Sequence, residues 1–249
     1  MIKIRAVKAA LLATPLALGM AAPVRAEDGA ALAARFGARP AVESVSLAPG
    51  GGQLALIVPD SGTGDILQIV DLAKGGEPKT IMRATGKGER IRQCSWPSDV
   101  RLVCTVTITA NVIDNIATIS RLITLNPDGS DLKLLTKETS SRALGLAYGG
   151  GAVIDWFAGR PGEVLMTRNF VPESTMGTHL ADTAEGYGVE SVDVSSLHRS
   201  VVEPARDRAY AYLSDGHGTV RVMGISPEGS GGYDSNRSNW YYRTPGNRS

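Results

Sequence analysis

A hairpin at Ile91–Cys104 restricts the possible fold more than any other stretch of this sequence. It reads Ile-Arg-Gln-Cys-Ser-Trp-Pro-Ser-Asp-Val-Arg-Leu-Val-Cys. We interpret it as a strand ending at Trp96, a turn over Pro97-Ser-Asp99 and a returning strand from Arg101, because proline, serine and aspartate favour tight turns. The stretch 45–58 has the same plan about fifty residues earlier. The chain is therefore predicted to be a row of similar hairpins.

Apolar stretches around these two hairpins fall into two similar groups. Each group has four stretches separated by three turns within about forty residues, which is the anatomy of one β-propeller blade. The first group is Val42–Leu47, Gln53–Val58, Ile66–Leu72 and Lys79–Met82. The second group is Ile91–Trp96, Arg101–Ile108, Ala117–Leu125 and Leu132–Leu135. Its turn at Asn126-Pro-Asp-Gly129 has proline to preset φ and glycine for the positive-φ position.

The rest of the chain continues this pattern less regularly. A third group is Ala152–Trp156, Glu163–Arg168, Gly188–Val194 and Arg199–Glu203. A fourth begins with 209–213 and 219–225, but after Pro227 only the run Trp240–Arg243 is apolar. An alanine-rich stretch within 27–37 favours a helix. We predict an all-β fold, a partial β-propeller of about four four-stranded blades with one short N-terminal helix.

The first 26 residues have the organisation of a secretory signal peptide. Three basic residues precede an apolar run over 9–22, and the segment ends in Pro-Val-Arg-Ala26. We expect cleavage after Ala26, which leaves one propeller domain over 27–249 in the periplasm or outside the cell. The apolar run is shorter than the about 20 residues of a membrane span, so no span is expected after cleavage. An amphipathic N-terminal helix is the alternative interpretation.

The charge of the mature chain gives no support to a nucleic-acid partner. The first 26 residues contain four of the 26 basic residues and none of the 25 acidic ones. The mature chain is therefore slightly acidic, whereas nucleic-acid binding calls for a basic surface. The 29 glycines and 13 prolines are spread along the chain, so no linker stands out and one all-β unit is favoured.

Residues for hydrolytic, metal or cofactor chemistry do not occur in a recognisable pattern. The sequence has no Gly-x-Ser-x-Gly, the turn that exposes the nucleophile of an α/β-hydrolase. The nearest stretch, Gly224-Ile-Ser-Pro-Glu-Gly229, has proline after the serine and lacks the N–H needed for an oxyanion hole, so a turn after a strand is favoured. His179, His198 and His217 lack zinc-ligand spacing. No phosphate loop or dinucleotide fingerprint is present. We predict no catalytic residue, metal or cofactor in this chain.

A few polar residues are candidates for the lining of a central funnel. Ser44, Ser46, Asp155, Trp156 and Asp215 could touch a peptide, and acidic residues there could bind its amino terminus. The favoured alternative is that these residues complete turns and strand ends, because buried polar groups are normally used in this way.

The two cysteines of the chain, Cys94 and Cys104, lie in the two strands of one predicted hairpin. Ten residues apart, they can sit opposite each other on paired strands, where the Cβ separation suits a disulfide. Export to an oxidising compartment favours the bond. We predict a Cys94–Cys104 disulfide, and two buried thiols are the alternative.

Four sets of residues occur in a characteristic order. They are Phe36-Gly-Ala-Arg-Pro40 leading into Val45-Ser-Leu-Ala-Pro-Gly-Gly51, Cys94-Ser-Trp96 with Arg101-Leu-Val-Cys104, Asn126-Pro-Asp-Gly-Ser130, and Asp215-Gly-His-Gly-Thr-Val-Arg221. In this order they resemble the secreted prolyl oligopeptidase-like serine peptidases of the dipeptidyl aminopeptidase and acylaminoacyl-peptidase branch. The resemblance covers Leu32 to Met223.

This resemblance implies an N-terminal propeller that covers an active site and limits access to it. In such enzymes the Ser, Asp and His lie in a following α/β-hydrolase domain, and this chain matches only the propeller part. We therefore expect no peptidase activity from the chain. Its expected partner is a peptide substrate or a missing or split catalytic domain. The alternative is a stand-alone periplasmic propeller that binds a protein or peptide, similar to the Tol translocation propeller.

Overall fold

The computed structural model describes residues 29–112, 115–145, 147, 149–157, 159–175, 177–178, 180–229 and 236–244. The chain divides into two units, Met1–Ala38 and Arg39–Ser249. The predicted signal peptide, residues 1–26, lies outside the described residues. The first unit contains the expected short helix, α1 (Gly29–Phe36), whose side chains are all exposed. No helix in the described part of the chain is long and apolar enough to cross a membrane.

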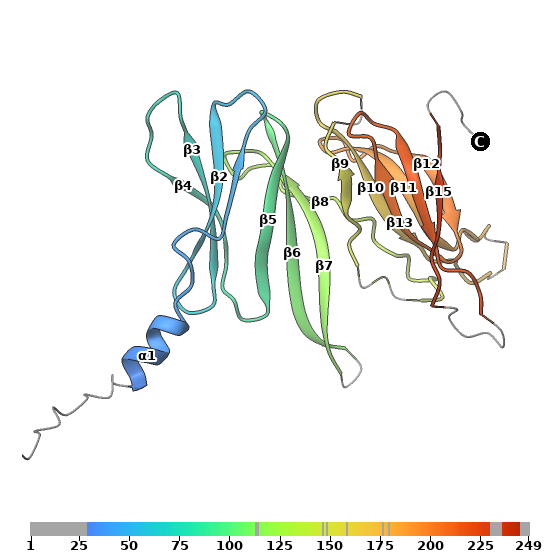
Figure 1. Ribbon diagram of the computed structural model, residues 1–249, viewed down its shortest axis with the longest axis horizontal. Coiled ribbons are helices and arrows are strands. Elements are labelled where there is room, and N and C mark those ends of the chain that lie inside the picture. The colour runs from blue at the N-terminus through green and yellow to red at the C-terminus, as the bar shows by residue number, and fades with distance from the viewer. Residues whose placement is uncertain are drawn as a thin grey trace, which may run out of the picture. The chain divides into compact units, whose positions relative to one another are not determined.

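The second unit consists of four antiparallel sheets whose strands are neighbours in chain order (Figure 1). The first sheet contains β1 (Ser44–Leu47), β2 (Gln53–Pro59), β3 (Asp65–Asp71) and β4 (Lys79–Ala84). The second contains β5 (Glu89–Ser98), β6 (Arg101–Val112), β7 (Asn115–Leu125) and β8 (Lys133–Leu134). The third contains β9 (Val153–Asp155), β10 (Glu163–Phe170), β11 (Gly186–Asp193) and β12 (Arg199–Arg206). The fourth contains β13 (Ala209–Ser214), β14 (Val220–Ile225) and β15 (Asn239–Tyr242). The predicted all-β partial propeller is confirmed.

The hairpin of β5 and β6 places the two cysteines opposite each other. Cys94 pairs with Cys104 across the strands, and a disulfide joins their sulfur atoms. The predicted turn is displaced, because β5 continues through Pro97 to Ser98, which pairs with Arg101. The register shifts just before Ser98. A bulge accommodates proline because it leaves a residue outside the regular hydrogen-bond ladder.

Three apolar cores join neighbouring sheets in chain order. They include Ile57, Leu67, Leu102 and Cys104 between the first and second sheets, Val103, Leu122, Val164 and Val192 between the second and third, and Leu165, Val189, Tyr212 and Val220 between the third and fourth. Successive residues of a strand point to opposite faces. Leu102 and Val103 of β6 therefore contribute to different cores, and the second sheet is covered on both faces.

Among the described residues the fourth sheet has three strands, one fewer than the other sheets. After β14 the residues 226–238 are rich in serine and glycine, which favour turns over strands. The apolar run Trp240-Tyr-Tyr242 forms most of β15, which pairs with β14. Only this run was available to extend the sheet within the described residues.

The first sheet is apolar on both faces. The second sheet covers one face through residues such as Ala55, Ile57, Leu67 and Ile69. The alternate residues point to the opposite face, which we call the open face. Its apolar residues are Val45, Leu47, Leu54, Leu56, Val58, Ile66 and Val70, and the polar Gln68 of β3 and Arg83 of β4 lie on the same face. The side chains of Val45 and Leu47 are 58% and 56% exposed. Strands with short continuous apolar runs are typical of sheets that are buried on both faces.

Candidate binding site between the third and fourth sheets

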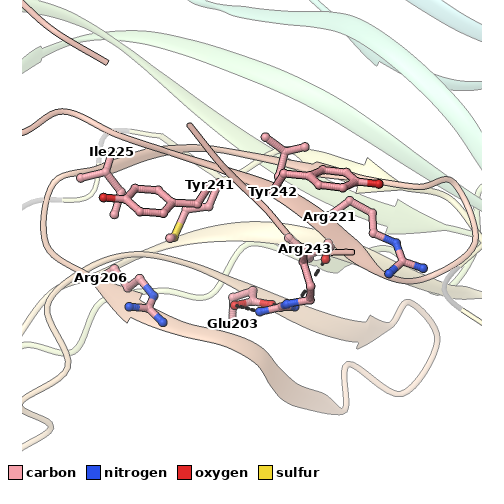
Figure 2. A pocket seen from close by; sticks show the side chains of 10 residues that line it. Glu203, Arg206, Arg221, Ile225, Tyr241, Tyr242 and Arg243 are labelled. Carbon is pink, nitrogen blue, oxygen red and sulfur yellow. Dashed lines mark hydrogen bonds and ion pairs between the residues drawn. The ribbon is translucent and has the colours of Figure 1, made fainter. Parts of the chain in front are cut away.

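A pocket of about 430 Å³ lies between β12 of the third sheet and the strands β14 and β15 of the fourth. Its walls carry the charged residues Glu203, Arg206, Arg221 and Arg243 beside Val220, Val222, Met223, Ile225, Tyr241 and Tyr242 (Figure 2). β12 is the fourth strand of the third sheet. Among the described residues, the fourth sheet has no fourth strand. The pocket therefore opens beside the shorter sheet.

The buried charge of the pocket is the carboxylate of Glu203, a residue that is 5% exposed. Nη1 of Arg243 lies 2.7 Å from Oε1, and Nη2 lies 3.3 Å from Oε2, so the guanidinium contacts both carboxylate oxygens. This hydrogen bonding raises the pKa of Arg243, although burial acts in the opposite direction. The backbone N–H of Arg243 also donates to the carbonyl oxygen of Arg221 at 2.8 Å. The ion pair thus ties β12 to the end of β15.

Arg221 is held by a second carboxylate at the edge of the pocket. Its Nε lies 2.9 Å from Oδ2 of Asp215. Asp215 also accepts hydrogen bonds from the backbone N–H groups of His217 and Thr219. Burial tends to raise the pKa of Asp215, but the two N–H groups and Arg221 outweigh it, and the pKa is lowered. Asp215 therefore stays ionised, closes its own turn and neutralises Arg221.

Arg206, at the end of β12, has no ion-pair partner within the described part of the chain. The charges of Arg243 and Arg221 are balanced by Glu203 and Asp215, whereas that of Arg206 is not. A guanidinium binds a carboxylate through two parallel hydrogen bonds. The neighbouring Tyr241 is 51% exposed and offers an aromatic surface. The pocket can therefore hold a ligand that joins a carboxylate to an apolar group.

Asp155 and Trp156, two of the candidates for a funnel lining, make contacts inside the fold, and Ser46 does so through its main chain. The carbonyl oxygen of Ser46 accepts a hydrogen bond from Nε1 of Trp96 at 3.0 Å. Asp155 accepts hydrogen bonds from the N–H groups of Phe157 at 3.0 Å and Gly218 at 2.7 Å. Trp156 packs against the core between the second and third sheets. These contacts favour the alternative interpretation, in which such residues complete turns and strand ends.

Residues screened for hydrolytic or metal chemistry are not brought together. Ser226 follows β14 directly, and its N–H donates to the carbonyl oxygen of Arg208 at 3.0 Å, which continues the hydrogen-bond ladder between β13 and β14. His198 and His217 are exposed, and His179 lies outside the described residues. Within the described ranges, no group of three or more His, Cys, Asp and Glu residues could hold a metal ion.

A buried carboxylate also joins the first and second sheets. Asp65 of β3 is fully buried and lies 2.7 Å from Nε of Arg90 on β5. It also binds Arg39 and accepts the N–H of Ile91. Burial tends to raise the pKa of Asp65, but Arg90, the Ile91 N–H and Arg39 outweigh it, and the pKa is lowered. Asp65 is therefore an ionised inter-sheet clamp.

Sequence reasoning missed the pocket. In the sequence, Glu203 and Arg206 lie at an ordinary strand end, and Trp240–Arg243 is an isolated apolar run. The pocket depends on the pairing of residues about forty positions apart, such as Glu203 and Arg243, which no local pattern reports. One usable signal was present: a carboxylate within the apolar stretch 199–203 needs a buried partner.

No family model matches the chain, and no curated protein sequence matches it. Its structure is similar to those of β-propeller domains of prolyl oligopeptidase-like peptidases. One is the β-propeller domain of the Trilobed protease from Pyrococcus furiosus, with 12% identity over 83% of this chain and 55% of that one and a TM-score of 0.45. Another is the Pyrococcus horikoshii acylaminoacyl peptidase, with 14% identity over 82% of this chain and 31% of that one and a TM-score of 0.44.

TolB from Acinetobacter baumannii is also similar, with 12% identity over 75% of this chain and 41% of that one and a TM-score of 0.35. The chain thus spans from about a third to about half of these proteins, at 31%, 41% and 55% of their lengths.

Proposed function

We propose that this chain is the non-catalytic propeller portion of a prolyl oligopeptidase-like serine peptidase. The α/β-hydrolase domain is then supplied by another segment or polypeptide. In this role the propeller is a scaffold that limits the access of large substrates to the active site. The ordered sequence motifs, from Phe36-Gly-Ala-Arg-Pro40 to Asp215-Gly-His-Gly-Thr-Val-Arg221, support this assignment.

The observation that carries the proposal is the open face of the first sheet. A stable monomer rarely exposes an apolar patch larger than a few hundred Å². Four strands about 4.8 Å apart and about 20 Å long present about 400 Å² per face. Aliphatic residues of β1, β2 and β3 form much of this face, and their burial calls for a further β-sheet, which fits one portion of a larger propeller.

The buried carboxylates support a structural role for the described residues. Asp65, Glu190 and Glu203 are each paired with arginine. An unpaired buried carboxylate would have a raised pKa and could act as an acid or base. Carboxylates that are paired with arginines from other strands instead stabilise the packing of the strands and sheets.

We assign the chain to an exported location. The signal-peptide organisation of residues 1–26 and the disulfide between Cys94 and Cys104 support this, because disulfides persist in oxidising compartments. Pulse-labelling tests the assignment: the exported product should begin at Glu27 and be found outside the cytoplasm. A product that retains residue 1 in the cytoplasm would contradict it.

The DNA that follows codon 249 tests the proposed function. We expect a continuous or interrupted frame that encodes Gly-x-Ser-x-Gly, followed by Asp and His, within roughly 250 codons, the size of one further domain. Expressing that segment with and without this chain then tests gating. Casein should be cleaved by the hydrolase segment alone and protected when the propeller is attached, while a short chromogenic peptide should be cleaved in both cases.

A second candidate is a stand-alone periplasmic propeller that binds a protein or peptide. The basic pocket between the third and fourth sheets favours this candidate. Within the described residues Arg206 has no ion-pair partner, so it can bind a carboxylate of a ligand. A clean stop after codon 249 followed by an unrelated gene would favour this candidate over the peptidase propeller.

A further inference from the structure

We propose that the free edge of β15 and the adjoining pocket form a docking site for an extended segment of a separate polypeptide that carries carboxylate side chains. The proposal does not rest on the peptidase assignment. It rests on three features: the free edge of β15 in the fourth sheet, the pocket between that sheet and the third, and Arg206 of β12, which has no ion-pair partner among the described residues.

The edge of β15 has backbone groups directed away from its partner strand. Within the described residues, β15 pairs only with β14. The N–H of Arg243 donates to the carbonyl of Arg221 at 2.8 Å, and this fixes the phase of the ladder. Because hydrogen-bonded and non-hydrogen-bonded pairs alternate in an antiparallel ladder, the N–H and C=O groups of Trp240 and Tyr242 point to the other edge. Such an edge is a template for another strand.

The two faces of β15 set which side chains of an added strand meet the pocket. Tyr241 pairs with Met223, which packs on the core between the third and fourth sheets, so Tyr241 is on the pocket side. Trp240 pairs with Gly224 on the opposite face, where its ring lies 5.7 Å from that of Tyr210. A residue of an added strand opposite Tyr241 therefore faces the pocket, and the residue opposite Trp240 lies on the other face, beside the Trp240 ring. Tyr242 also lines the pocket.

The unbalanced charge of Arg206 determines which kind of segment the pocket can bind. Figure 2 shows Arg206 and the Glu203–Arg243 pair along the same wall of the pocket. Arg206 has no ion-pair partner among the described residues, so a carboxylate that enters the pocket gains a partner without displacing one. The opposite face offers the rings of Trp240 and Tyr210 to apolar side chains. The occupant is thus an extended segment in which acidic and apolar residues alternate.

A capped heptapeptide of alternating valine and glutamate, labelled with fluorescein, is the probe for this site. Anisotropy titration should give saturable binding to the intact oxidised chain, and Arg206→Ala should weaken it roughly tenfold, the effect of losing one charge-assisted contact. Arg142→Ala is the matched control, because Arg142 is also exposed and lies outside the pocket. It should leave the affinity unchanged. Circular dichroism verifies that both variants are folded.

Two modified peptides separate strand addition from general attraction. A peptide with lysine in place of glutamate should lose binding, and one N-methylated at alternate amides should also lose it, because it cannot complete the ladder. In spectra of the labelled protein, the amides of Trp240 and Tyr242 should shift and exchange more slowly. Absence of saturable binding up to 1 mM peptide, equal binding of the lysine peptide, or a protein dimer formed through β15 would each overturn the proposal.

Discussion

Replacing Asp65 by asparagine tests whether buried ion pairs hold successive sheets together. The substitution keeps the shape of the side chain and removes its charge. Arg90 on β5, in the second sheet, and Arg39 would then lose their shared carboxylate, and the oxygen that accepts the Ile91 N–H would be less basic. The contact between the first and second sheets should weaken.

The expected loss in the free energy of unfolding is about 2–3 kcal/mol. Removing one partner of a fully buried pair costs about 3–5 kcal/mol. Arg39 and Arg90 are 22% and 24% exposed, so water can solvate part of their charge once the carboxylate is gone. The loss in unfolding free energy should therefore lie at or just below the lower end of the about 3–5 kcal/mol expected for a fully buried pair.

Urea unfolding followed by tryptophan fluorescence measures this loss. With a denaturant slope of about 2–3 kcal/mol/M, the midpoint of Asp65→Asn should fall by about 1 M at pH 7. The control is Asp207→Asn, because Asp207 is 85% exposed and its midpoint should not move.

The pH dependence follows from the lowered pKa of Asp65. A carboxyl whose folded pKa lies below its unfolded value of about 3.9 stabilises the fold fully above that pH. The contribution is lost as the pH falls through the folded pKa. The difference in unfolding free energy between wild type and Asp65→Asn should therefore be constant from about pH 5 to about pH 7 and should shrink below about pH 4. Equal midpoints for the two proteins at pH 7 would refute the clamp.

Three further predictions concern the disulfide, the open face and the pocket. A non-reducing peptide map should join the peptides of Cys94 and Cys104, and replacing both by alanine should cost about 3 kcal/mol; two freely alkylated thiols would contradict this. Val45→Lys, on the open face, should reduce both aggregation and the binding of an apolar dye. Circular dichroism should show no loss of folded structure. Unchanged dye binding would show that this face is already covered. Glu203→Gln should lower stability by about 1–3 kcal/mol in a thermal melt, because it weakens the pair with Arg243; an unchanged melting temperature would argue against that pair.

Much of the fold was predictable because its signals are local. Turn residues such as those of Asn126-Pro-Asp-Gly129 separate short apolar runs, and these two signals together locate most strands of the first three sheets. The cross-strand position of Cys94 and Cys104 follows from their place in one hairpin. Strand ends were less accurate, as in β5, where a bulge carries the strand through Pro97.

The fourth sheet and the candidate pocket could not be predicted in the same way. Whether β15 joins β14 depends on pairing across a segment that has no strand signal of its own. The ion pair between Glu203 and Arg243 links positions forty residues apart. Such contacts depend on how sheets pack in space, and the sequence reports them only indirectly, through a charge within an apolar stretch.

Hydrolysis by the purified chain alone tests the central claim most directly. The oxidised chain is incubated with aminoacyl and dipeptidyl chromogenic substrates, and a fluorophosphonate probe reports any activated serine. We predict no turnover above that of buffer and no covalent labelling, because the reactive Ser, Asp and His are assigned to a separate hydrolase domain. Saturable turnover together with labelling of a serine in this chain would contradict its role as a non-catalytic propeller.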